Sequence, residues 1–132
     1  MLDKQIREQI IALINREVVP AVGCTEPMCV SLCVARATET LGFCPEKITV
    51  LLSSNILKNA MGVGIPGTGM IGLPIAVALG ALVGKSEYQL EVLKDLTPET
   101  SAINSVLIPS LCISYSTMRA NRLLVAARTT KI

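Results

Sequence analysis

The chain has 132 residues and a formal net charge of +2; 51% of its residues are hydrophobic and only 2% are aromatic. A chain of this length forms one domain at most, and its core must come from aliphatic side chains. It contains no histidine, which excludes Ser-His and Cys-His catalytic pairs and the common histidine metal sites. Basic residues form no stripe interleaved with aromatics, so we expect no nucleic-acid partner.

Charged residues interrupt every apolar run near the N-terminus, so no signal peptide is expected. The chain has five cysteines and no export feature. This combination indicates the cytoplasm, where thiols stay reduced unless they bind metal.

The first predicted element is an amphipathic helix over residues 2–18. Apolar residues recur there at three- and four-residue steps, while Lys4, Arg7 and Glu8 face outward. Pro20 ends this helix.

A second helix is predicted to begin at Thr25, a good N-cap residue, and to run to about Thr40. Pro27 suits its first turn, and Glu26 is favourably placed near the positive end of the helix dipole. Gly42 is the C-terminal stop.

Residues 47–55 are β-branched and apolar and predict a strand. Residues 58–84 then give a glycine-rich loop, followed by an Ala/Leu/Val helix from about Leu73. A short amphipathic helix is expected over residues 86–95. Residues 96–99 resemble another capped helix start, but no helical pattern follows.

These elements predict an α/β (α+β) fold in which helices pack on a small sheet beside a glycine-rich loop. These helix and strand patterns all lie within residues 1–98, which are interpreted as the N-terminal part of a larger domain. Residues 99–132 have no clean period, hold four basic residues and no acidic one after position 100, and are expected to be a divergent tail, disordered or frameshifted.

Three cysteines cluster early, at Cys24, Cys29 and Cys33, in a spacing typical of neither zinc nor ferredoxin sites. Cys29 and Cys33 lie four residues apart on one helix face and are interpreted as core residues. Cys24 lies at the helix N-terminus, where free N–H groups stabilise a thiolate, and Gly23 leaves room for a ligand. Cys24 is therefore either a reactive thiol with a pKa below about 8.5 or a cysteine held in a turn.

The glycine-rich loop contains two overlapping matches to G-x-G-x-x-G, at residues 62–67 and 67–72. They lie well beyond the strand and indicate glycine density rather than a dinucleotide site, and no Gly-Lys-Ser/Thr follows to make a P-loop. Two interpretations stay open: the loop is an anion-binding site formed by backbone N–H groups, or it is a segment whose glycines allow close packing.

A membrane interpretation rests on residues 59–84, which carry no charge and are long enough to span a bilayer. The seven glycines and two prolines in this run weigh against a transmembrane helix.

Two motifs together carry a family resemblance: "VVPAVGCTEP" and "SSNILKNAMGVGIPGTGMIGLPIAVALGAL". From about residue 10 to Pro98 the chain resembles the N-terminal region of the L-cysteine desulfidase family, which is related to the iron–sulfur L-serine dehydratases. The resemblance implies a soluble enzyme that uses a [4Fe-4S] cluster to convert L-cysteine to pyruvate, ammonia and hydrogen sulfide.

In that family the cysteine of the C-T-E-P motif, here Cys24, is thought to be the catalytic base. A thiolate can take the weakly acidic α-proton while an open iron acts as a Lewis acid. A turn over residues 53–58 and the glycine loop would hold the substrate carboxylate. The residues expected to bind substrate are Ser53, Asn55, Lys58, Asn59, Gly67, Thr68 and Gly69.

The chain departs from the family in several places. The family has glycine where this chain has Ser54 and Ala60. Its members are several times longer, and their cluster-binding cysteines lie downstream of anything here, so Cys112 is assigned no cluster role. We therefore expect a truncated or frameshifted piece that binds no metal and has no desulfidase activity alone. We also expect it to self-associate through apolar surface on the helix over residues 73–84.

Two other classes of protein remain open. One is a non-catalytic subunit or interaction module that completes its fold on a second chain, which would carry the missing region. The other is a small membrane protein.

Overall fold

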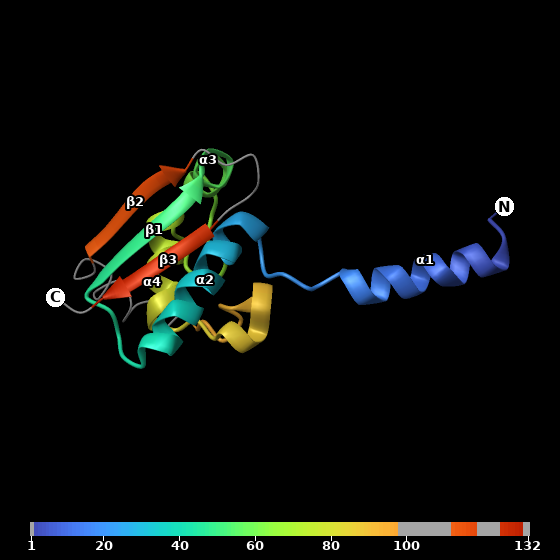
Figure 1. Cartoon of the computed structure of the whole chain (residues 1–132), viewed down its shortest axis with the longest axis horizontal. Helices are drawn as coiled ribbons and strands as arrows, with labels where there is room; N and C mark the ends of the chain where they lie inside the picture. The colour runs from blue at the N-terminus through green and yellow to red at the C-terminus, as the bar shows by residue number, and fades with distance from the viewer. Residues whose placement is uncertain (1, 98–111, 119–124, 131–132) are drawn as a thin grey trace.

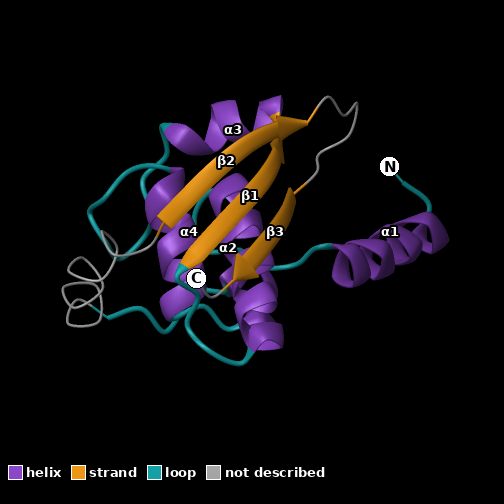
Figure 2. Cartoon of the chain, turned by 60° about the vertical axis from the view of Figure 1, so that its left-hand side comes forward, coloured by secondary structure: helices purple, strands orange, loops and turns teal. Residues whose placement is uncertain are grey.

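The computed structural model describes residues 2–97, 112–118 and 125–130 (Figure 1). A three-stranded sheet forms one layer, and two helices, α2 and α4, form the other (Figure 2). The expected α/β class, with helices packed on a small sheet, is confirmed. In chain order the elements are α1 (Lys4–Glu17), α2 (Thr25–Leu41), β1 (Lys47–Ser53), α3 (Ser54–Met61), α4 (Leu73–Leu82), the 3-10 helix η1 (Ser86–Glu91), β2 (Cys112–Met118) and β3 (Val125–Thr130).

The sheet has the order β2-β1-β3, with the predicted strand β1 at its centre. β2 runs parallel to β1, with Val50 opposite Tyr115, and β3 runs antiparallel, with Leu52 opposite Val125. Sequence analysis predicted no strand after residue 99, so both partners of β1 were missed. The domain boundary near residue 98 and the frameshift stay predictions.

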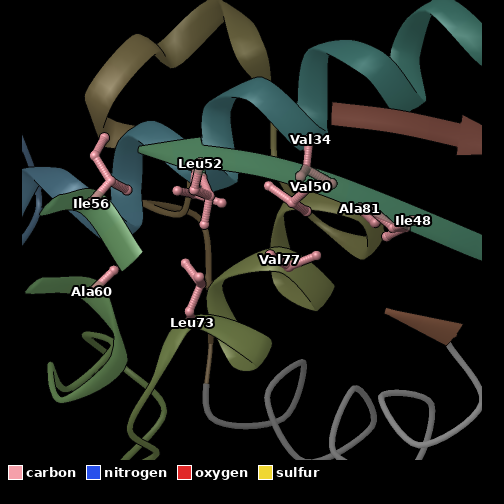
Figure 3. Packing of buried hydrophobic residues seen from close by; sticks show 10 residues of the cluster. Val34, Ile48, Val50, Leu52, Ile56, Ala60, Leu73, Val77 and Ala81 are labelled. Carbon is pink, nitrogen blue, oxygen red and sulfur yellow. The ribbon is translucent and has the colours of Figure 1, made fainter. Parts of the chain in front are cut away.

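One buried cluster joins the sheet to the helices (Figure 3). Alternate residues of β1 point into it, as the period of a half-buried strand requires. The cluster draws on α2, β1, α3 and α4: Val30, Val34, Ile48, Val50, Leu52, Ile56, Ala60, Leu73, Val77 and Ala81.

Helix α4 is apolar on all sides and lies inside the molecule, with seven of its ten residues buried. The expectation that residues 73–84 would expose apolar surface is therefore wrong. A second buried cluster covers its other side, with Ala76 and Leu79 packed against Met28, Ala35 and Val92 among others.

Helices α2 and α4 approach each other closely at Ser31 and Gly80. The fully buried Ser31 hydroxyl donates a hydrogen bond of 2.7 Å to the carbonyl oxygen of Ala76. A Cβ atom at Gly80 would lie 2.6 Å from the Ser31 carbonyl oxygen and 2.9 Å from its Cα. Glycine is therefore the residue that lets these backbones meet.

Two local predictions need correction. Residues 53–58 were expected to form a turn, but α3 begins at Ser54, directly after the strand. The helix expected over residues 86–95 is the short 3-10 helix η1, interrupted at Gln89 (φ 52°, ψ −124°). Half of the expected helix start at residues 96–99, and all of the helix that would follow it up to residue 111, lies outside the described residues.

Helix α1 was predicted correctly but stands away from the rest of the molecule (Figure 1). None of its residues is buried, and apolar side chains such as Ile10 (40% exposed) and Leu13 (50% exposed) face solvent. The apolar stripe predicted a helix packed on a core, yet no described residue covers it. Within the described ranges, no helix combines the length and apolarity needed to cross a bilayer.

Because α1 buries nothing, we expect Ile10→Val to change the free energy of unfolding by less than about 0.5 kcal/mol. The same substitution at the fully buried Ile48 of β1 should cost about 1 kcal/mol. Urea unfolding of the two variants measures both values. Equal losses would show that α1 packs as firmly as the core.

Candidate functional site

Cys24 lies at the start of α2, where it occupies the N-cap position with extended backbone angles (φ −72°, ψ 134°). Thr25, the predicted N-cap, is the first residue of the helix instead. The predicted C-terminal stop at Gly42 is confirmed, with φ 80° in the left-handed region. The helix thus places the Cys24 thiol at its positive end, half-exposed to solvent.

The thiol has a partner that sequence analysis did not foresee. Cys24 Sγ donates a hydrogen bond of 2.8 Å to Glu26 Oε2. Thr25 Oγ1 donates to the same oxygen at 3.3 Å, and Asn59 Nδ2 of α3 donates to Glu26 Oε1 at 3.2 Å. Glu26 therefore joins the C-T-E-P motif to the predicted substrate-binding residue Asn59, which lies on another helix.

The Glu26 carboxylate reverses the expected ionisation of the thiol. Its hydrogen bond with Cys24 raises the pKa of that thiol above the ordinary value for cysteine. The same bond, assisted by the backbone N–H of Glu26 and by Asn59, lowers the pKa of the Glu26 carboxyl. The expected low thiol pKa is therefore wrong, because a carboxylate in direct contact outweighs the helix dipole.

The glycine loop folds on itself between Val63 and Gly72. A tight turn is closed by the bond from Thr68 N to Ile65 O (3.2 Å), with Gly67 at φ 78°. Proline at the second position and glycine with positive φ at the third are the residues of a type II turn. The loop is closed further by Ile65 N to Met70 O and Gly72 N to Val63 O, both 2.9 Å.

These hydrogen bonds reduce the number of backbone N–H groups with which the loop could bind an anion. The Thr68 hydroxyl donates to Ile65 O at 2.7 Å and accepts from Met70 N at 2.9 Å, so it stabilises the turn itself. Several of the N–H groups expected to be available are likewise bonded inside the loop. Gly67 and Gly69, both exposed and with positive φ, are among the positions whose N–H groups donate to no other backbone group of the loop.

The loop lies against the turn that carries Cys24. A Cβ atom at Gly23 (φ 81°) would lie 2.5 Å from Pro66 Cγ, so Gly23 and the loop are in direct contact. Val22 N also donates to Leu90 O at 3.3 Å, which ties the same turn to η1. The two motifs of the family resemblance therefore meet at Gly23 and Pro66.

The remaining predicted residues lie on β1 and α3. Ser53 is buried at the end of β1 as the N-cap of α3, and its hydroxyl has no hydrogen-bond partner among the described residues. Asn55 and Lys58 are exposed on α3. Of the predicted substrate-binding residues in the described part of the chain, Asn59 is the one whose side chain is hydrogen-bonded to the Cys24–Glu26 pair.

Of the other cysteines, Cys29 and Cys33 were expected to be core residues. Cys29 and Cys33 are half-buried, and burial raises the pKa of the Cys29 thiol. Cys44 and Cys112 are exposed. Among the described residues, no three Cys, Asp or Glu side chains converge into a group that could hold a metal ion.

The positive φ at Gly67 gives a test of the loop. We expect Gly67→Ala to destabilise the chain by about 1–2 kcal/mol, because a Cβ atom is disfavoured in the left-handed region. Gly64→Ala, in the same loop and facing open space, is the matched control and should be near neutral. Chemical denaturation compares the two variants; equal effects would show that the turn is not fixed by Gly67.

Comparisons with known proteins identify relatives that are much longer than this chain. It is 75% identical over 114 residues to a UPF0597 protein of Phocaeicola vulgatus, covering 86% of this chain and 26% of that protein. A UPF0597 protein of Bacteroides fragilis is 76% identical over 110 residues, covering 82% and 26%, and one of Photobacterium profundum is 52% identical over 116 residues, covering 88% and 27%.

The chain thus spans about a quarter of the length of the curated relatives that it matches. No family model matches it, and no solved structure matches it.

Proposed function

We propose that this chain is the thiol-bearing part of a UPF0597-type lyase that releases sulfide from L-cysteine, giving pyruvate, ammonia and hydrogen sulfide. The observation that carries the proposal is the contact of two distant segments around Cys24. Asn59 of α3 reaches the Cys24–Glu26 pair, and Pro66 of the glycine loop packs on Gly23. Both segments belong to the motifs that resemble L-cysteine desulfidases.

Cys24 is proposed as the base. As a thiolate it takes the α-proton of the substrate, the Cβ–S bond breaks, and the electron pair of the C–H bond forms the double bond of an enamine. Sulfide leaves with the pair of the C–S bond, and hydrolysis of the enamine gives pyruvate and ammonia. A thiol at a helix start beside open solvent has the access that this role needs.

The substrate carboxylate is proposed to lie near the start of α3. The unpartnered Ser53 hydroxyl is buried there, and the first N–H groups of a helix favour an anion. Asn55, Lys58 and Asn59 on α3, with the turn at Gly67–Gly69, complete the proposed polar surroundings. Thr68 supports this site by fixing the turn, because its hydroxyl is already bonded within it.

The [4Fe-4S] cluster that the resemblance implies does not fit the described residues, since they offer no converging set of ligands. We propose that its ligands belong to the three-quarters of the relatives' length that this chain does not span. We derive no step of the elimination through it. A second chain carrying that region is then the proposed partner, and the cytoplasm the proposed compartment.

A chimera tests the proposal. Residues 1–97 of this chain replace the matching part of the Phocaeicola vulgatus protein, where the high identity favours a compatible fit. After anaerobic reconstitution with iron and sulfide, we expect equal amounts of sulfide and pyruvate from L-cysteine. The 132-residue chain alone, treated identically, should show no turnover. A folded, reconstituted chimera without sulfide release would contradict the proposed function.

A second candidate is an interaction module without catalytic activity. The exposed apolar stripe of α1 favours it, because isolated amphipathic helices gain most of their stability from packing. In this case the chimera would fold and release no sulfide.

A further inference from the structure

Glu26 is held at both of its carboxylate oxygens. Oε2 accepts the Cys24 thiol at 2.8 Å and Oε1 accepts Asn59 Nδ2 at 3.2 Å. The first bond comes from the residue that caps α2, and the second from α3, which follows β1 in the chain. A carboxylate anchored from two elements has little freedom to rotate, so the S–H bond of Cys24 is aimed at a fixed acceptor.

We infer that Glu26 is the positioning residue of the Cys24 thiol: its carboxylate keeps the sulfur protonated in the resting chain, and Asn59 fixes the orientation of that carboxylate. The catalytic meaning of this inference rests on the proposed function, whereas the geometry does not. Ionisation of Cys24 would place a second negative charge 2.8 Å from an existing one. The thiolate therefore forms less readily here than in free cysteine.

Among the described residues no cationic side chain acts on the Cys24 sulfur; the opposing influence comes from the backbone N–H groups of Thr25 and Glu26 at the start of α2, which favour the thiolate. Among the described residues, Glu26 is the ionisable group that acts on Cys24, and the glycine loop, residues 62–72, carries no charge at all. α3 contributes the neutral amide of Asn59 and carries the exposed cation Lys58, and neither Lys58 nor an ionisable group of η1 is among the groups that shift the pKa of Cys24. The Glu26 carboxylate is thus the side chain that acts most strongly on the protonation state of Cys24.

This arrangement suits a base that must remove a weakly acidic proton. A thiolate whose pKa is raised is a stronger base, although a smaller fraction of the sulfur is ionised at neutral pH. A raised pKa also protects the resting thiol from oxidation and alkylation, since the thiolate is the reactive form. Glu26 would then provide both base strength and protection.

The pH dependence of alkylation at Cys24 tests the inference without substrate or cluster. The full chain is treated briefly with iodoacetamide between pH 6 and pH 10, and labelling of Cys24 is followed by mass spectrometry. For wild type we expect the midpoint to lie above that of free cysteine. Glu26→Gln keeps the shape and removes the charge, so its midpoint should fall by about one pH unit or more, with about tenfold faster labelling near neutral pH.

Two further variants separate positioning from general structural effects. Asn59→Ala frees one carboxylate oxygen and should give a midpoint between those of wild type and Glu26→Gln. Glu87→Gln removes an exposed carboxylate of η1 and should leave the Cys24 profile unchanged. Circular dichroism of each variant checks that the total helix content of the chain is unchanged.

The inference would be overturned if folded Glu26→Gln had the same midpoint as wild type in the pH dependence of Cys24 labelling. It would also be overturned if Glu87→Gln shifted that midpoint as much as Glu26→Gln does. A wild-type profile in Asn59→Ala would overturn the role of Asn59. The two proposals can fail separately. If the Cys24 labelling profile shifts in Glu26→Gln but the chimera is inactive, only the proposed function is contradicted. If the chimera is active but the labelling profile does not shift, only the role of Glu26 is contradicted.

Discussion

Gly80→Ala should destabilise the chain by about 2 kcal/mol, although helix propensity alone predicts the opposite sign. Alanine is favoured over glycine inside a helix by about 1 kcal/mol. Against this, the new Cβ atom would lie 2.6 Å from the carbonyl oxygen and 2.9 Å from the Cα of Ser31. These are backbone atoms of α2 and cannot rotate away, so the two helices must separate. Such overpacking costs about 1–3 kcal/mol, and the shortness of the contacts points to the upper end.

Gly62→Ala is the control for this substitution. Gly62 follows α3 at φ −101°, and a Cβ atom there would meet nothing within 4 Å. Equilibrium unfolding in urea should show a loss for Gly80→Ala and almost none for Gly62→Ala. A gain of stability at Gly80 would mean that α2 and α4 are farther apart than the structure has them.

The elements with strong local signals could be predicted from the sequence. The cap and stop residues of α2 placed its ends within one or two residues, and the β-branched run placed β1. Strands β2 and β3 were missed because serines interrupt the apolar residues of β2, and two alanines, which are depleted in strands, lie in the short β3. In β2, Ile113 and Tyr115 do alternate with serines and pack against the core, but that short alternation was obscured by the irregular sequence around it.

The burial of a helix depends on its neighbours more than on its own pattern. The stripe of α1 and the uniform apolarity of α4 both indicated hydrophobic surfaces, but only α4 is covered. A periodic pattern predicts which face of a helix is apolar enough to be buried. It does not predict whether other described residues cover that face.

Sequence analysis identified most residues of the candidate site but not the hydrogen bonds that join them. Sequence analysis singled out Cys24, Asn59 and the glycine loop, but it assigned Glu26 only to the helix dipole. The Cys24–Glu26 contact joins two side chains only two residues apart, but it is not a capping box, because Glu26 stands at the second helical position and accepts from the thiol rather than from the backbone N–H of the N-cap residue. The bond from Asn59 to Glu26 depends on how α3 packs near α2, which no local pattern encodes.

Cys24→Ser should lower the kcat of the chimera by about 10²–10⁴-fold, the range over which a positioned general base contributes. A serine hydroxyl is of similar size but does not ionise near neutral pH, so the variant loses the proposed base with little change in shape. Cys29→Ser, on the same helix and half-buried, is the matched control and should keep most of the turnover. Rates of sulfide release from L-cysteine give both values.

Loss of folding cannot mimic this result, because Cys24 is the N-cap of α2 and serine is among the best N-cap residues. The Cys24→Ser variant should therefore be as stable as the parent or slightly more stable, and thermal unfolding of the chimera measures this. An inactive and stable variant indicates that the sulfur itself takes part in the reaction. If Cys24→Ser kept the turnover of the parent, the base would be another group, and the contact of the C-T-E-P motif with Asn59 and the glycine loop would be structural.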